Sequence, residues 1–253
     1  MKMSAADIAS ILKSLPPTAI SKIEIVRTPS AKYDASSSGG VVNVVLKKGV
    51  KIGLTGSVNA GIQQGHYGNQ LIGFNLNNND GNRTISVNLN YSHRNSYEKL
   101  ITDRIFAPDS VLSQEAYTAY PGHTFFGSYV YSWTAKKWEF ELSGTANWNL
   151  SDNKTDNQNR IEKISTAQLL TSNLNQVSNK GNALVIGNGF ETKLKIDSSG
   201  SEWTSQVFYY NTHNNSDQAY STRYYSPAIF ITAGDGSADN KRELVSGRTD
   251  LRL

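Results

Sequence analysis

The chain has 253 residues, of which 38% are hydrophobic and 10% aromatic, and its formal net charge is +4. Its Lys and Arg residues are scattered rather than gathered on one element, which argues against a nucleic-acid-binding protein. Cysteine is absent, which excludes disulfides and cysteine-ligated zinc sites, and the low hydrophobic fraction favours sheets with one apolar and one uncharged polar face.

The first 49 residues are predicted to form a small α+β unit. Ser4 is a suitable N-cap for a helix whose apolar residues recur at helical spacing up to Leu15, and Pro16-Pro17 ends it. Residues 20–26 and 41–46 are predicted strands. No secretory signal is visible at the N-terminus, so we expect the natural N-terminus to lie further upstream.

After Gly49 the sequence changes to long segments that alternate between apolar and polar residues. In the clearest of them Trp138, Phe140 and Leu142 begin an apolar face, while Glu139 and Glu141 begin the opposite one. The pattern predicts seven strands and an eighth that begins near Leu244, with the seven at 51–63, 69–77, 84–92, 123–133, 138–150, 183–196 and 202–210.

The length of these segments and of their links predicts a transmembrane β-barrel. Several segments reach the ~9–11 residues that a membrane-spanning strand needs. The apolar faces of the four clearest segments carry no charge, as a lipid-facing surface requires. Short links at 78–82, 134–137 and 197–201 alternate with long polar ones at about 93–122, 151–182 and 211–241. Outer-membrane barrels alternate short periplasmic turns with long extracellular loops in this way.

No catalytic or metal-binding set emerges from the sequence. The four histidines, His66, His93, His123 and His213, lack metal-ligand spacing. Residues 235–239 lack the ligand ladder and closing glutamate of a calcium loop, and we expect a plain loop there. We therefore predict a protein that is not an enzyme and that uses no metal or cofactor.

The segment from Leu15 to Gly49, LPPTAISKIEIVRTPSAKYDASSSGGVVNVVLKKG, resembles the C-terminal part of the plug in TonB-dependent outer-membrane receptors. It is most similar to the outer-membrane β-barrel family common in Bacteroidetes. Thr28 stands where the wider family often has glycine, which leaves the substrate class open. The motif residues, with a structural role in the plug, are Glu24, Pro29, Ser30, Tyr33, Asp34, Gly39, Gly40, Asn43, Lys47 and Lys48.

The resemblance implies the end of a plug domain at 1–49 and the first part of a transmembrane barrel at 50–253. It implies a mainly-β fold with about 8 of the ~22 strands of a barrel whose lumen holds the plug. Its partners would be outer-membrane lipid, the periplasmic TonB protein, reached through an upstream segment, and a scarce small ligand such as a siderophore, glycan or peptide. The charges of the segment itself allow two interpretations: Glu24, Arg27, Lys47 and Lys48 pair with the polar barrel wall, for example with Glu139 or Glu141, or they remain solvated.

Two other functions remain open at this stage. The chain could belong to a structural or adhesive surface β-protein without transport, either a small barrel or a secreted β-sandwich. A barrel enzyme is a third class, but the sequence offers no nucleophile cluster for it.

Overall fold

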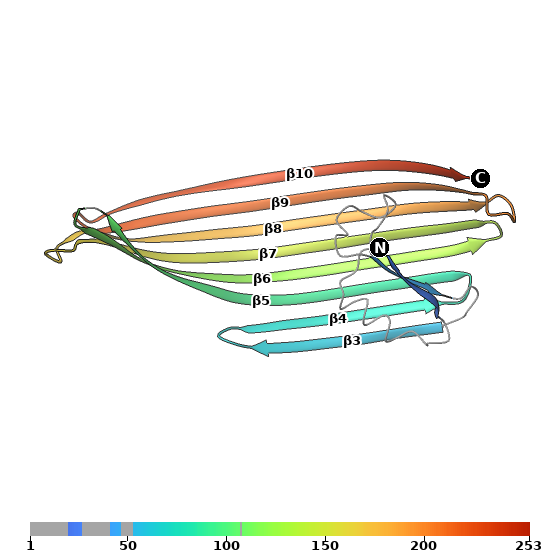
Figure 1. The fold of residues 1–253 in the computed structure, drawn as a ribbon, viewed down its shortest axis with the longest axis horizontal. Helices are drawn as coiled ribbons and strands as arrows, with labels where there is room; N and C mark the ends of the chain where they lie inside the picture. Colours follow the sequence, from blue (N-terminus) through green and yellow to red (C-terminus); the bar gives the residue numbers. More distant parts are fainter. Residues whose placement is uncertain (1–19, 27–40, 47–52, 107) are drawn as a thin grey trace.

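The computed structural model describes residues 20–26, 41–46, 53–106 and 108–253, and nearly all of them lie in antiparallel strands (Figure 1). The predicted mainly-β fold with eight strands in the second part of the chain is confirmed. The first sheet contains β1 (Ile20–Val26) and β2 (Val41–Leu46), as predicted. The second contains β3 (Gly53–Gln64), β4 (Gly68–Asn79), β5 (Arg83–Phe106), β6 (Ser110–Ala135), β7 (Trp138–Lys163), β8 (Leu169–Lys195), β9 (Glu202–Ser226) and β10 (Phe230–Arg252).

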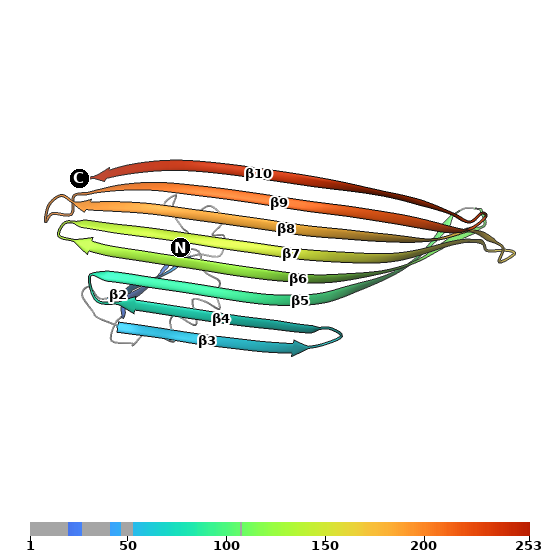
Figure 2. The same cartoon turned by 180° about the vertical axis from the view of Figure 1, so that it is seen from behind.

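The eight-stranded sheet is a meander in which each strand pairs with the next one in the chain, from β3 to β10. The front and back views show these strands as one layer (Figures 1 and 2). No side chain among the described residues is almost completely buried. The sheet therefore lacks the dry interior that two packed layers of a β-sandwich would enclose.

Direct cross-strand pairing gives the sheet two distinct faces. Trp138 lies opposite Leu194, and Leu142 lies opposite both Tyr131 and Phe190. Paired residues in an antiparallel sheet project to the same side, so the apolar faces of neighbouring strands join into one surface. The predicted division of 138–150 into an apolar and a polar face is confirmed by this register.

The long polar links predicted at about 93–122, 151–182 and 211–241 are wrong, because most of these residues continue the strands. β6 already begins at Ser110 after β5 ends at Phe106, and β10 begins at Phe230 after β9 ends at Ser226. Apolar and polar residues do not alternate regularly in these extensions, so the pattern that indicates a strand is missing although the backbone remains paired. Residues 235–239 likewise lie inside β10 and not in a loop.

The predicted short links are tight turns, as expected. Gly81 has φ 95°, and its N–H donates to Asn79 Oδ1 at 2.7 Å. At the turn between β8 and β9, the hydrogen bonds that Asp197 accepts from Ser201 and Ser199 hold the pKa of its carboxyl well below the usual range. These turns all lie at one end of the sheet (Figure 1), which we call the short-turn end.

The β3–β4 hairpin is much shorter than the other strands, and it ends near their middle (Figure 1). Its tip packs on β5 and β6, where the Tyr67 and Tyr117 hydroxyls form a hydrogen bond of 2.7 Å. Beyond that tip, β5 to β10 continue as a six-stranded extension, which we call the far half of the sheet. Among the described residues, no helix is long and apolar enough to cross a membrane.

Hydrogen exchange can test whether the far half is paired. Residues 154–160 of β7 have strand partners on both sides, in β6 and in β8. We expect their amides to exchange orders of magnitude more slowly than those of the turn at 197–201, because exchange requires local opening of the sheet. Equal exchange rates in the two segments would show that 151–182 is a loop after all.

Candidate functional site

An exposed band of apolar side chains crosses the sheet next to the short-turn end. Its members project from one face of all eight strands, and we call this surface the apolar band. They are Leu54, Val58 and Ile62 of β3, Ile72, Phe74 and Leu76 of β4, Ile85, Val87 and Leu89 of β5, Phe125, Tyr129 and Tyr131 of β6, Phe140, Leu142 and Trp148 of β7, Leu184, Ile186 and Phe190 of β8, Val207 and Tyr209 of β9, and Val245 and Leu251 of β10.

The apolar band is exposed and almost free of charge. Val58 is 70% exposed, Leu89 51% and Val245 69%. From β3 to β9 none of the positions on this face between these apolar residues is Asp, Glu, Lys or Arg. β10 departs from the rule with Lys241 and Glu243, which lie opposite His213 and Asn211 of β9. Glu243 accepts a hydrogen bond from Asn211 Nδ2 at 3.0 Å. Soluble monomeric proteins rarely expose an apolar surface of this extent, which makes the apolar band a candidate contact surface for lipid or for another protein.

The length of the apolar band along its strands can be compared with the thickness of the hydrocarbon part of a bilayer. From Trp138 to Trp148 the strand rises roughly 34 Å at ~3.4 Å per residue. A strand tilted by ~40° then crosses roughly 26 Å, close to the ~25 Å apolar height of outer-membrane barrels.

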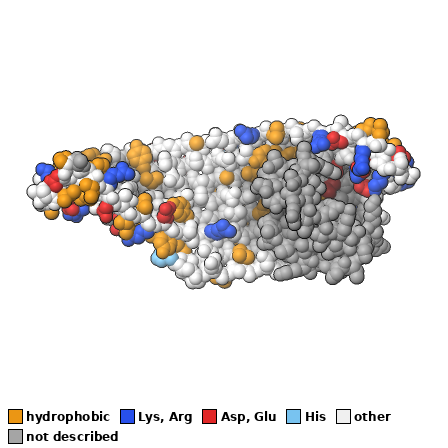
Figure 3. All heavy atoms as spheres, in the orientation of Figure 1, with side chains coloured by type: hydrophobic (Ala, Val, Ile, Leu, Met, Phe, Trp, Pro, Cys, Tyr) orange, Lys and Arg blue, Asp and Glu red, His pale blue; other side chains and the backbone are white. Residues whose placement is uncertain are grey.

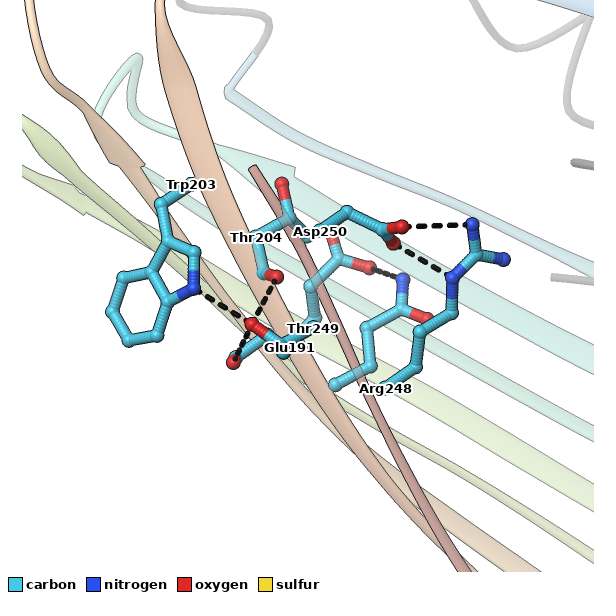
Figure 4. Close-up of polar contacts among 8 residues, drawn as sticks. Glu191, Trp203, Thr204, Arg248, Thr249 and Asp250 are labelled. Atoms are coloured by element: carbon cyan, nitrogen blue, oxygen red, sulfur yellow. Dashed lines mark hydrogen bonds and ion pairs between the residues drawn. The ribbon is translucent and has the colours of Figure 1, made fainter. Parts of the chain in front are cut away.

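Aromatic side chains border the band at the short-turn end. The ring of Trp133 stacks on Phe140 at 4.9 Å, and Trp138 meets Trp203 edge to face at 6.1 Å between ring centroids. The Trp203 indole N–H donates to Thr249 Oγ1 at 2.7 Å (Figure 4). Rings with an apolar body and a polar edge are typical of the boundary between hydrocarbon and water.

A second aromatic border lies on the side of the far half. His93 and His123 stack at 4.6 Å between ring centroids, and the Tyr91 hydroxyl forms a 2.9 Å hydrogen bond with His123 Nδ1. Trp148 stacks on Phe125 and donates its indole N–H to Asn182 Oδ1 at 2.7 Å. Trp148 lies inside β7, at the edge of the apolar band.

The opposite face of the same segment is polar and mostly uncharged, and we call it the polar wall. Asn75, Asn88 and Ser128 lie side by side on β4, β5 and β6, and all three are at most 7% exposed. In Figure 3 the middle of the visible face is mostly white, the colour of uncharged polar side chains and backbone. Small amide and hydroxyl side chains of this kind suit a surface that contacts water or another polar protein segment.

Charged groups on the polar wall gather toward the short-turn end of β7 to β10. Lys193 pairs with Glu202 at 2.6 Å, and Lys195 pairs with Glu139. Glu141 lies directly opposite Glu191, so two carboxylates face the same space.

Two more polar contacts of the wall appear in Figure 4. Glu191 accepts a hydrogen bond from Gln206, and Arg248 pairs with Asp250 at 2.7 Å. Of the predicted wall partners, Glu139 is thus already paired within the wall. No ion pair of Glu141 occurs among the described residues.

The predicted plug motif is described only in part. Glu24 lies in β1 and Asn43 in β2, and the register places these two positions directly opposite each other. The remaining motif residues lie outside the described residues; they are Pro29, Ser30, Tyr33, Asp34, Gly39, Gly40, Lys47 and Lys48. The predicted helix over 4–15 lies outside them as well.

Comparison with known proteins gives no family for this chain. No protein-family model matches it, and no curated protein matches its sequence. In the part of the chain that the structure describes, no three His, Cys, Asp or Glu side chains converge to hold a metal ion. The candidate functional site is therefore the pair of surfaces, the apolar band and the polar wall.

The close packing of Gly144 in the apolar band can be tested by mutation. A Cβ atom at this position would lie 2.5 Å from the Tyr129 ring, whose hydroxyl donates to Asn188 Oδ1 at 2.9 Å. We expect Gly144→Ala to lower the free energy of unfolding in detergent micelles by about 1–3 kcal/mol, as overpacking does. Urea titration followed by tryptophan fluorescence measures this loss.

Gly247→Ala is the matched control, because it lies on the same face and a Cβ there meets nothing closer than 3.8 Å. Alanine in a strand is otherwise no worse than glycine, so the control should be neutral or slightly stabilising. Equal stability of the two variants would show that Tyr129 does not cover Gly144.

Proposed function

We propose that the chain is part of an outer-membrane receptor that takes up a scarce ligand with energy supplied through TonB. The observation that carries this proposal is the apolar band, which is exposed, nearly uncharged and bordered by aromatic rings on both sides. At the tilt of ~40° that is usual for outer-membrane strands, its height would be roughly 26 Å. Because backbone groups in lipid must be satisfied internally, such a sheet can span a membrane only as part of a closed barrel.

The polar wall supports the second part of the proposal, a lumen filled by a plug. In a large barrel the inner face is polar and encloses either water or a folded plug. The carboxylates of Glu141 and Glu191 face the same space and favour a cationic partner. Arg27, Lys47 and Lys48 of the motif at 15–49 are the cations that the proposal assigns to this wall.

Uptake follows from the same assignment. The short-turn end would face the periplasm, the far half of the sheet would stand outside the cell, and movement of the plug would open a path for the ligand. A siderophore, a glycan and a peptide are all compatible with this surface. A structural or adhesive barrel without transport is the alternative, favoured by the large external extension that β5 to β10 form.

A pair of arginine substitutions tests contact with lipid. Ala146 and Thr145 are consecutive and both exposed in β7, but Ala146 belongs to the face of the apolar band and Thr145 to the polar wall. We expect Ala146→Arg to lower the free energy of unfolding in lipid vesicles by about 2–4 kcal/mol, because lipid does not solvate the charge. Thr145→Arg should cost far less. Equal effects would mean that water covers both faces, and the membrane assignment would be wrong.

Uptake itself is tested in bacteria that carry the complete gene, with and without TonB. The probes are a radiolabelled ferric siderophore, an oligosaccharide and an oligopeptide. We expect at least one probe to accumulate only in the cells with TonB. A protein that reaches the outer membrane but gives no TonB-dependent uptake of any probe would instead support the structural or adhesive alternative.

A further inference from the structure

One edge of β5 is open in the far half of the sheet. The last pair between β4 and β5 joins Gln70 to His93, whereas the pairing of β5 with β6 continues to Phe106. Among the described strands, residues 96–106 therefore have a neighbour on one side only. This opening results from the short β3–β4 hairpin, and it lies inside the order of strands rather than at β3 or β10.

The backbone groups that point toward this opening are those of the odd-numbered residues. The Arg83 carbonyl accepts from the Asp80 N–H at 3.1 Å, and the Asn95 N–H donates to Asn69 Oδ1 at 2.6 Å, both on the side of β4. Successive residues of a strand direct their backbone groups to alternate sides, and the β5–β6 register is uninterrupted. The N–H and C=O groups of residues 97, 99, 101, 103 and 105 therefore face the open edge.

The side chains along this edge are exposed and in part apolar. Tyr97 is 48% exposed, Ile101 65% and Ile105 75%. A long edge with exposed apolar residues and unpaired backbone groups is a ready template for another strand.

We propose that a second copy of this chain pairs with the edge, antiparallel and centred on Ile101. In this register Glu98 lies opposite Arg104 of the second copy, and both belong to the polar face. Lys99 lies opposite Asp103 of the second copy on the other face. Two-fold symmetry repeats both contacts, so four cross-strand pairs of opposite charge form around a central pair of Ile101 residues.

The charge pattern selects this register over its neighbours. A shift that keeps each face must move the centre by one residue, to Leu100 or Thr102. Centred on Leu100, Glu98 would face Thr102 and Lys99 would face Ile101. Centred on Thr102, Glu98 would face Phe106 and Lys99 would face Ile105. Neither shift pairs any opposite charges, so only the register centred on Ile101 is complementary in charge.

The charges also match the contacts already made within one copy. Arg104 has no polar partner among the described residues, whereas Glu98 accepts a 3.1 Å hydrogen bond from the Tyr120 hydroxyl. Lys99 pairs with Glu115 at 2.7 Å, and Asp103 accepts from the Ser113 hydroxyl at 2.7 Å. Association would thus supply Arg104 with a carboxylate. It would also add a residue of the second copy to the contacts that Lys99 and Asp103 already make within one copy.

The backbone adds hydrogen bonds without a change of conformation. The five outward-facing residues would form five hydrogen-bonded pairs, each of which exchanges two bonds, for about ten in all. The edge is a small interface, so we expect a reversible dimer rather than an obligate one. The pairing does not depend on the proposed function. If the chain does span an outer membrane, the antiparallel arrangement would join copies in two membranes that face each other.

Cysteine cross-linking tests this register directly, because the chain contains no cysteine. In a hydrogen-bonded antiparallel pair the Cα atoms lie ~5.5 Å apart, within the range of a disulfide. We expect Ile101→Cys, purified in detergent micelles and mildly oxidised, to give a covalent dimer on a non-reducing gel. Ile105→Cys is the matched control, since it shares the edge, the face and the exposure but would lie roughly 27 Å from its symmetry mate.

Charge exchange in the Ile101→Cys background provides the second test. Glu98→Arg places arginine opposite arginine, and we expect the cross-linking rate to fall roughly tenfold through loss of both symmetric pairs. Adding Arg104→Glu in the same chain restores opposite charges and should restore the rate. Equal cross-linking of the Ile105→Cys control, or failure of the exchanged pair to recover, would overturn the proposal. A monomeric Ile101→Cys variant would also overturn the proposal, and an extended peptide of another protein would then be the candidate occupant of the edge.

Discussion

The structure depends on one interaction, the ladder of backbone hydrogen bonds between neighbouring antiparallel strands. In a protein with a core, burial of apolar side chains supplies most of the stabilisation. Here the eight strands form one layer, and the apolar band lies exposed on one of its two faces. The ladder holds the strands together, but it leaves the apolar band uncovered. Whatever covers that band completes the fold, and this requirement links the architecture to its surroundings.

The strand segments that have one apolar and one polar face could be predicted from the sequence. In 138–150 each apolar residue alternates with a polar one, and the structure has a strand there with the predicted faces. The short link predicted at 78–82 is a turn in which Gly81 adopts a positive φ, a conformation that glycine accepts without strain. In 151–163 both faces are polar, so alternation could not distinguish a paired strand from a loop. The pairing of 151–163 depends on the adjacent strands β6 and β8, and the periodicity of a single segment contains no information about its neighbours.

The candidate site divides in the same way. The apolar band could be predicted residue by residue, because it consists of the apolar half of each alternating segment. The contacts of the polar wall could not, because they join different strands and depend on register. Lys195 and Glu202 flank the turn at 197–201, so counting outward from it would have placed Glu202 near Lys193. Lys195 and Glu139 are 56 residues apart in neighbouring strands, so their pairing depends on the register of β7 with β8 along almost the whole length of both strands. The stacking of His93 on His123 could not be predicted either, since these residues are far apart in sequence and meet only through the β5–β6 register.

The replacement of the expected loops by paired strands changes the thermodynamics of anything that binds to the far half. A flexible loop loses conformational entropy when it closes on a ligand, at roughly 1–2 kcal/mol per residue whose backbone becomes fixed. The backbone of residues 154–160 is already fixed in the sheet, so its conformational entropy is lost on folding and not on binding. A ligand that rests on Tyr117 or Lys154 would therefore meet a preorganised surface, and little affinity would be lost to ordering the protein. Selectivity on such a surface would come from fixed spacing between side chains rather than from adaptation of the backbone.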